Sequence, residues 1–462
     1  MSEEISTIDA MLQRVNAARL KGDGALLGGI VSYLEAIPFS KTLQVHRYRL
    51  ANGLSLLLLE DHSAPVVAYH TWYRVGSRHE REGKTGLSHL FEHLMFNETE
   101  NLPAGEFDRK LEEAGAESNA STWLDWTHYN IAIPKDQLPL VIGLEAERMA
   151  HLVLKDPQVT SEKEVVANER RYRVDDDVEG AISELLWATC FREHAYRWPT
   201  IGWMQDIEGF TTEDCRQFYK TYYSPNNATV VVAGSFDTET LLSSVAAAYG
   251  SMAPALLPVE EVKPEPPQTE ERRVEVQKPT VSEKLAIGYH CPALGDFDHA
   301  PLTLLCEILF GGRASRLVKK MVRELELASE VRMFVGPFHD PGMMELFASA
   351  RDSHTAEEML AVIDQEFERV RNEAIAVSEI ERALARFELG MLAGLETADS
   401  KASTIGFYET VLGDPGASFA RLAALRRQNQ SDLLRVARRY LTPQTRSVII
   451  VHPTGSVLEA AQ

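Results

Sequence analysis

Apolar and polar positions alternate with two different periods along the chain, and the period predicts strands or helices. The segment HRYRLANGLSLLLLED has apolar runs on both sides of Asn52 and Gly53, which predicts two strands joined by a tight turn. PVVAYHTWYRVG predicts another strand, and from Gly86 the apolar spacing becomes helical. Strands and helices then alternate to about Gly250, so we expect an α/β domain over residues 41–250.

The first 40 residues follow a different pattern. Apolar positions between residues 6 and 35 have a helical spacing that is interrupted near Gly22 and Gly24. We therefore expect residues 1–40 to form an N-terminal helical extension of one or two amphipathic helices.

Residues 251–280 contain six prolines and the charged run VEEVKPEPPQTEERR. Because proline lacks an N–H donor and fixes φ, we expect an extended linker here and no regular packed element. The linker separates residues 41–250 from a second domain over residues 281–455.

The two halves of the chain resemble each other. The order strand, loop, helix in PVVAYHTWYRVG and GLSHLFEHLMF recurs in SEKLAIGYHCPAL and PLTLLCEILFGG. Near their ends, DCRQFYKTYYSPNNATVVVAGSFD and LLRVARRYLTPQTRSVIIVHPTG each place a proline turn between a helix and a β-branched run. We infer an internal duplication.

The amino-acid composition argues against several classes of function. The formal net charge of −21 argues against binding to nucleic acid or to an anionic membrane surface. The four cysteines form no CxxC pair, which argues against a disulfide scaffold or a cysteine zinc site. The N-terminus MSEEISTIDAMLQRV lacks a secretory pattern, and no run of about 18 apolar residues occurs, so we expect a cytoplasmic protein without a membrane span.

The segment GLSHLFEHLMF carries the strongest candidate for chemistry, with His89, Glu92 and His93 in one predicted helix. Residues four apart share a helix face, so both imidazoles can reach one zinc ion at about 2.0–2.1 Å. Glu92 lies beside the same site and can accept a proton from an activated water. The order H-x-x-E-H reverses the commoner H-E-x-x-H zinc helix. The alternative is two ordinary polar histidines.

A catalytic zinc needs a third protein ligand, and SEKEVVANERRYR offers Glu162, Glu164 and Glu169 in a predicted helix. Glu162 and Glu169 are seven apart and share a face, so one can bind the metal while the other orients a ligand. The alternative is a solvated acidic helix face.

The second half lacks both histidines. Aligning GLSHLFEHLMF with PLTLLCEILF places Leu304 and Ile308 at the two histidine positions, whereas Glu307 aligns with the first-half glutamate. This asymmetry predicts an active first half and a degenerate second half.

Together with NASTWLDWTHY, HAYRWPTIGW and YYSPNNATVVVAGSFD, these motifs resemble the pitrilysin or insulinase family of zinc metallopeptidases over about residues 41–455. The size and two-half layout resemble its short, mitochondrial-processing-peptidase-like subfamily. The resemblance implies two homologous α/β sandwich domains, each a mixed sheet with helices packed on one face. It also implies a Zn²⁺ cofactor held by His89, His93 and Glu169, with Glu92 as the general base.

The resemblance further implies residues that support the metal and hold a peptide. Glu162 matches an acidic residue in a supporting role. Asn119, Ala120, Ser121 and Thr122 match an edge strand beside the metal, to which an extended peptide adds through main-chain hydrogen bonds. The alternative is a polar strand without this role.

One departure from the family pattern concerns the second half. Active members carry an arginine and, seven residues later, a tyrosine that grip the substrate and stabilise the oxyanion. Here Arg323 is present, but Ser329 and Glu330 stand near the tyrosine position, and neither can replace a phenol. We expect a heterodimer with a related chain that supplies the Arg/Tyr pair and closes as a clamshell around the peptide. The alternatives are a homodimer that uses Arg323 or Arg316 alone, and a tyrosine from elsewhere in this chain.

The function expected from these observations is a zinc-dependent endopeptidase that cleaves extended peptides inside a chamber. A zinc hydrolase of a non-peptide substrate is one alternative. A non-catalytic scaffold subunit is another, but the complete set of metal residues in the first half argues against it.

Overall fold

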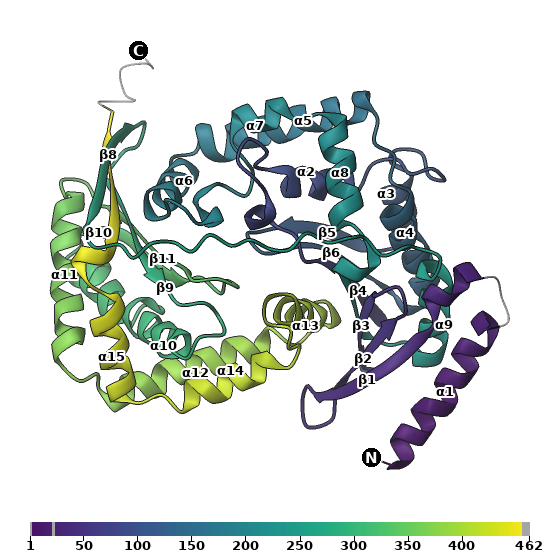
Figure 1. Ribbon diagram of the computed structural model, residues 1–462. Coiled ribbons are helices and arrows are strands. Elements are labelled where there is room, and N and C mark those ends of the chain that lie inside the picture. The colour runs from purple at the N-terminus through teal and green to yellow at the C-terminus, as the bar shows by residue number, and fades with distance from the viewer. Residues whose placement is uncertain (1, 21–23, 455–462) are drawn as a thin grey trace. The chain divides into compact units, whose positions relative to one another are not determined.

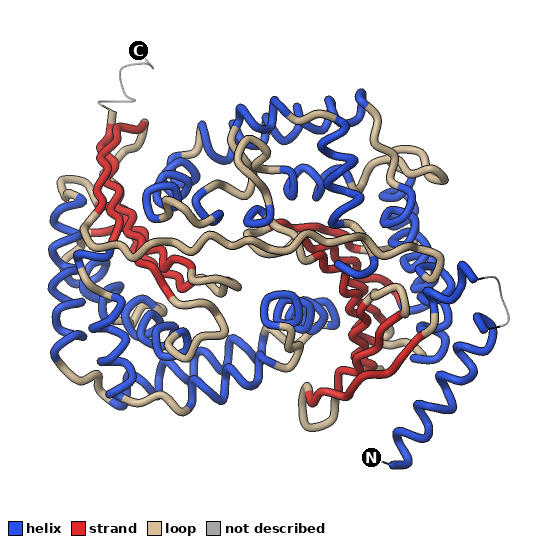
Figure 2. The backbone as a smooth tube through the Cα atoms, in the orientation of Figure 1, coloured by secondary structure: helices blue, strands red, loops and turns tan. Residues whose placement is uncertain are grey.

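The computed structural model describes residues 2–20 and 24–454, which form two compact units. Unit 1 contains the chain up to Ala167 together with Thr200–Glu261 and Leu392–Phe419. Unit 2 contains Asn168–Pro199, Val262–Met391 and the chain from Ala420. Each unit is built around one mixed β-sheet (Figures 1 and 2). The predicted α/β class with two related sheet domains is therefore confirmed.

Unit 1 contains a seven-stranded sheet in the order β1-β2-β3-β7-β4-β6-β5. Its strands β3 and β7 are parallel, and the other neighbours are antiparallel. The strands are β1 Val31–Pro38, β2 Gln44–Leu50, β3 Ser55–Glu60, β4 Val66–Tyr73, β5 Glu117–Thr122, β6 Thr127–Pro134 and β7 Ala228–Gly234. The helices are α1 Ser2–Leu20, α2 Leu87–Leu94, α3 Glu106–Glu113, α4 Leu138–His151, α5 Asp156–Arg170, α7 Met204–Gly209, α8 Thr212–Tyr222, α9 Thr238–Tyr249 and α13 Ala398–Leu412. The last three residues of α5 are counted with unit 2.

The continuous apolar run SLLLLE in β3 is explained by burial on both faces of the sheet. Leu56 and Leu58 belong to the main core, which also contains residues of α2, α4, α8 and α9. Leu57 and Leu59 belong to a second core on the opposite face, formed with residues of α13.

Unit 2 contains a five-stranded sheet in the order β10-β11-β9-β12-β8, in which β12 and β8 are parallel. The strands are β8 Arg272–Lys278, β9 Lys284–Cys291, β10 Ala328–Val335, β11 Gly342–Ala350 and β12 Arg446–Pro453. The remaining helices are α6 Val178–Cys190, α10 His299–Phe310, α11 Ala356–Asn372, α12 Val377–Ala393, α14 Ala417–Arg426 and α15 Gln430–Tyr440. The end of α12 and the start of α14 are counted with unit 1. One face carries a core that includes residues of α10, α11 and α15.

Each sheet also carries one helix from the other half of the sequence. Helix α13 packs on β4 and β7 of the first sheet, and α6 packs on β9 and β12 of the second sheet. A glycine permits close approach at each place. A Cβ on Gly406 of α13 would lie 2.0 Å from Trp72 Nε1, and one on Gly288 of β9 would lie 3.2 Å from Cys190 Sγ. The resemblance implies helices on one face of each sheet. In the structure, helices pack on both faces.

Ion pairs fasten α13 to the first sheet. Arg47 donates to both carboxylate oxygens of buried Glu409 at 2.8 Å, and Lys401 Nζ lies 2.7 Å from Asp61 Oδ2. Removing one partner of a buried pair leaves an uncompensated charge, so these contacts fix the position of α13 along the sheet.

Strand β1 corrects the prediction of a wholly helical extension. Residues 2–20 form the predicted helix, but residues 31–38 pair antiparallel with β2. The apolar spacing of this segment is compatible with either element, and antiparallel pairing with the next strand along the chain decides between them. Residues 21–23, including the predicted break at Gly22, lie outside the described residues.

Strand β8 corrects the prediction that residues 251–280 contain no regular element. Residues 252–271 are irregular, as expected. The alternating segment Arg272–Lys278, however, lies beyond the proline cluster and pairs with β12. The irregular part is also anchored, because Glu265 accepts hydrogen bonds from the N–H groups of Arg192, Glu193 and His194 at 2.9–3.0 Å.

No helix within residues 2–20 and 24–454 is long and apolar enough to cross a membrane.

Candidate metal centre

Helix α2 carries His89, Glu92 and His93, and it forms where the spacing predicts it. Its N-cap is Gly86, with φ at +94°, a conformation that suits glycine. The apolar positions of α2 are buried in the main core, His89 is buried, and Glu92 and His93 are half-buried. The ring centroids of His89 and His93 lie 4.9 Å apart, so both imidazoles are on one face.

Helix α5 brings a carboxylate to these histidines. Within residues 2–20 and 24–454, one group of three side chains of metal-ligand type lies close enough together to share an ion, and it consists of His89, His93 and Glu169. One ligand atom from each lies within 4.8 Å of the others. A tetrahedral zinc ion with bonds of about 2.0–2.1 Å needs donors roughly 3.3 Å apart, so small side-chain adjustments would bring all three to one ion. Two imidazoles and one carboxylate are a donor set that suits catalytic zinc.

Glu162 lies seven residues, or about two turns, before Glu169 on α5, and it contacts His93. Its Oε1 is 3.2 Å from His93 Nδ1, and its Oε2 accepts a hydrogen bond of 3.1 Å from Asn97 Nδ2. If His93 donates through Nδ1, its Nε2 is left as the lone-pair nitrogen. Glu164 is exposed, in contrast to half-buried Glu162 and Glu169.

The predicted edge strand lies at the end of the first sheet. Strand β5 contains Asn119, Ala120, Ser121 and Thr122, and among the strands of residues 2–20 and 24–454 it pairs only with β6. Asn119 and Ser121 are exposed, whereas Ala120 is buried. Helix α2 packs against β5 and β6, so the helix that carries His89 and His93 lies next to this edge (Figure 1).

The second-half residues belong to unit 2. Arg323 lies in a π-helical segment, Val318–Glu324, and is exposed. Arg316 is engaged in ion pairs with Glu366 and Glu379 at 3.0 and 2.7 Å, which argues against a free role in substrate binding.

The two residues near the expected tyrosine position, Ser329 and Glu330, lie on edge strand β10. Ser329 donates to the carbonyl oxygen of Ser349, and Glu330 forms an ion pair with Arg332. Both side chains therefore have structural partners within unit 2.

Two residues that the sequence did not single out contact α2. Buried Glu80 accepts hydrogen bonds from the N–H groups of Gly86 and Ser88 at 2.7 and 2.6 Å. Burial raises the pKa of Glu80 to about 8, and the backbone hydrogen bonds oppose this rise. Buried Tyr129 of β6 donates its hydroxyl to the carbonyl oxygen of Phe91 at 2.9 Å. Tyr129 ends the quoted segment NASTWLDWTHY, but no spacing in the sequence indicates its contact with α2, and no motif includes Glu80.

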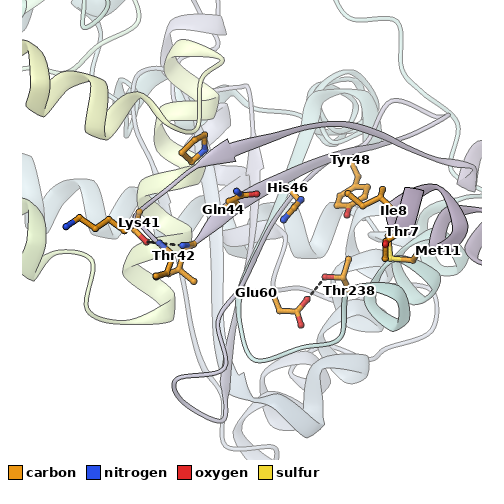
Figure 3. A pocket seen from close by; sticks show the side chains of 13 residues that line it. Thr7, Ile8, Met11, Lys41, Thr42, Gln44, His46, Tyr48, Glu60 and Thr238 are labelled. Carbon is orange, nitrogen blue, oxygen red and sulfur yellow. Dashed lines mark hydrogen bonds between the residues drawn. The ribbon is translucent and has the colours of Figure 1, made fainter. Parts of the chain in front are cut away.

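The N-terminal extension lines a separate cavity of about 610 Å³ in unit 1 (Figure 3). Thr7, Ile8 and Met11 of α1 form one side of this cavity. The carboxylate of Glu60 at its margin accepts a hydrogen bond of 2.6 Å from Thr238. This cavity contains none of the predicted site residues.

Two family models match the chain. The model described as insulinase (peptidase family M16) matches residues 55–202, and the model described as peptidase M16 inactive domain matches residues 209–387. The first match contains His89, His93 and Glu169, and the second contains none of these three residues.

Relatives and solved structures agree with these matches. The zinc protease PqqE of Helicobacter pylori is 30% identical over 414 residues, covering 87% of this chain and 92% of that protein. A crystal structure of a protease from Helicobacter pylori has a TM-score of 0.85 at 29% identity, covering 88% of this chain and 99% of that one. A putative M16-like peptidase from Alicyclobacillus acidocaldarius has the same fold, with a TM-score of 0.78 at 20% identity over 90% of this chain and 99% of that one.

Proposed function

Because the chain belongs to the insulinase family of peptidases, family M16, we propose that it is a zinc-dependent endopeptidase. The observation that carries the proposal is the convergence of His89, His93 and Glu169 from two helices. We assign these three residues as the zinc ligands and Glu92 as the general base. Zinc, when bound, supplies a Lewis acid that activates water and polarises a peptide carbonyl.

In this scheme the chain's own residues move the proton and orient the ligands. Glu92 accepts the proton of the attacking water and passes it to the leaving amine. Glu162 holds His93 through Nδ1, which fixes the tautomer that presents Nε2 to a metal. These roles agree with the position of Glu162 and Glu169 of α5 beside the histidines of α2.

The proposed substrate is a peptide in extended form. Strand β5 is an edge strand with exposed side chains at Asn119 and Ser121, so its main chain is a template for one more strand. Main-chain pairing gives affinity with little dependence on sequence. We propose Asn119, Ala120, Ser121 and Thr122 as the segment to which the substrate adds.

The oxyanion group is proposed to come from a partner. Arg323 is exposed and remains a candidate for substrate binding, but no tyrosine follows it at the expected spacing. We propose a heterodimer with a related chain that supplies an Arg/Tyr pair.

The test of the metal site combines zinc analysis with peptide hydrolysis. Wild-type protein is expected to hold one zinc ion per chain, and His89→Ala and His93→Ala are expected to lose it. His151→Ala is the matched control, because this half-exposed histidine is outside the group. Zinc that is absent from the wild type, or unchanged in both ligand variants, would contradict the assignment.

The test of the base uses Glu92→Gln, which preserves size and removes basicity. We expect zinc content to be retained and hydrolysis to fall by about 10²–10⁴-fold. A zinc-loaded Glu92→Gln protein with wild-type turnover would remove Glu92 from the mechanism.

A further inference from the structure

The short length of α2 makes its position dependent on the residues around it. It contains eight residues, or about two turns, and helices of this length are marginal without tertiary contacts. Three of the eight are proposed to act on zinc or on a proton. A small rotation of α2 would therefore move all three proposed functional groups at once.

The N-terminus of α2 lacks a cap of its own. Its N-cap residue is Gly86, which has no side chain to accept hydrogen bonds from the free N–H groups of the first turn. Glu80 supplies this function from the preceding loop, because its two oxygens accept from Gly86 and Ser88. Ser88 is adjacent to His89, so the capped turn is the one that carries the first histidine.

The second turn of α2 is held by a hydrogen bond from strand β6. The carbonyl oxygen of Phe91 accepts a hydrogen bond from Tyr129 Oη at 2.9 Å, in addition to the bond of 3.2 Å from Met95 N. Phe91 immediately precedes Glu92. The ring of Tyr129 is fixed in turn, because the guanidinium of buried Arg148 lies 4.3 Å from its centroid.

We propose that Glu80 and Tyr129 are positioning residues that hold the two turns of α2 and thereby set the rotation and axial position of His89, Glu92 and His93. This inference rests on the proposed function, because it assigns a role toward the same zinc site. Neither residue is proposed to touch metal or substrate.

The main experiment compares two tyrosine variants that each lose one buried hydroxyl. Tyr129→Phe removes the bond to Phe91, whereas Tyr69→Phe removes a bond of 2.9 Å between Tyr69 and Tyr249 in the same core. We expect Tyr129→Phe to lower zinc affinity or kcat by about 10–100-fold, and Tyr69→Phe to change both by less than about twofold. The visible spectrum of the cobalt-substituted protein should shift only in Tyr129→Phe.

A second pair of variants tests Glu80. Above about pH 8, where the Glu80 carboxyl is ionised, Glu80→Gln loses one of the two acceptor oxygens. Glu265→Gln is the control, because Glu265 also accepts backbone N–H groups but lies in unit 2. We expect about a 10–100-fold loss of zinc affinity in Glu80→Gln, partial recovery in Glu80→Asp, and no change in Glu265→Gln. If Glu80→Gln does not fold, the comparison of Tyr129→Phe with Tyr69→Phe alone tests the positioning role.

The outcomes separate this inference from the proposed function. A wild type that binds no zinc overturns the proposed function. A wild type that binds zinc and hydrolyses peptides, with Tyr129→Phe matching Tyr69→Phe in zinc affinity, kcat and cobalt spectrum, overturns only the positioning roles.

Discussion

Glu162 and Glu164 allow a test at the scale of single residues, because they lie two positions apart on α5 and differ in what they contact. Glu162 reaches His93 and Asn97, whereas Glu164 is exposed. We expect Glu162→Gln to weaken zinc binding by about 10–100-fold, and Glu164→Gln to leave it unchanged. Chelator competition on both purified variants measures the difference. Equal zinc affinities would leave Glu162 as an ordinary acidic residue.

Glu345 predicts a pH dependence of stability in unit 2. Its Oε1 accepts a hydrogen bond of 2.8 Å from Trp187, and burial raises the pKa of Glu345 to about 7. Between about pH 4.5 and 7 the unfolded chain has lost this proton while the folded chain retains it, so stability falls as pH rises through this window. Above about pH 7 both states are ionised, and the loss is complete.

The measurement is urea unfolding of the wild type and Glu345→Gln from about pH 5 to pH 8, a range that spans the raised pKa. The amide of the variant keeps an acceptor for Trp187 and cannot ionise, so the variant is expected to gain stability relative to the wild type as pH rises. The relative gain should be on the order of 1–3 kcal/mol by about pH 8. A difference that does not change with pH would show that Glu345 titrates normally in the folded protein.

Residue spacing predicted His89, Glu92 and His93 as one group because all three lie within five residues of one helix. Glu80 and Tyr129 were not predicted, since a loop and a distant strand bring them to α2. Local spacing does not record such contacts.

The packing of whole elements can be tested at Gly406 and Gly390, two glycines in different helices. A Cβ on Gly406 would meet Trp72 Nε1 at 2.0 Å, whereas one on Gly390 of α12 has no neighbour within 4 Å. We expect Gly406→Ala to destabilise the protein by about 1–3 kcal/mol through overpacking. Gly390→Ala should stabilise it by about 0.5–1 kcal/mol through helix propensity. Denaturation of both variants is the measurement, and a neutral or stabilising Gly406→Ala would mean that α13 adjusts freely.

Elements whose conformation depends on neighbouring residues were predicted correctly. Strands that form only by pairing with another strand were missed. The turn at Asn52 and Gly53 and the helix from Gly86 depend on neighbouring residues and are confirmed. Strands β1 and β8 were missed because each gains its structure from a partner strand. In β8 the partner is β12, more than 150 residues away.

At the scale of the whole molecule, the proposed partner predicts a rate difference. The purified chain alone is expected to cleave peptides slowly, and a related chain carrying the Arg/Tyr pair should raise the rate by about 10²–10³-fold, the value of one oxyanion donor. The experiment is a peptide-cleavage assay with and without the added chain, with size-exclusion chromatography to detect the complex. Full activity of the chain alone would favour a homodimer or a tyrosine from elsewhere in this chain.

The duplication was visible in the sequence, but the sharing of helices between its halves was not. The repeat order predicts two similar sheets, which the structure contains. Contacts between α13 and β4 join residues more than 300 positions apart, and no sequence pattern reports them.

The placement of α6 and α13, each on the sheet of the opposite half, limits how the gene can recombine with those of its relatives. Each sheet has, in addition to the helices of its own half, one helix encoded by the opposite half of the gene. A recombination event within residues 251–271 would therefore give each sheet a foreign helix, with a mismatched contact at Trp72 or Gly288. The two halves, although they look like separable repeats, have to vary together, and half-gene exchange between relatives should be tolerated only when these helices travel with the sheets they cover.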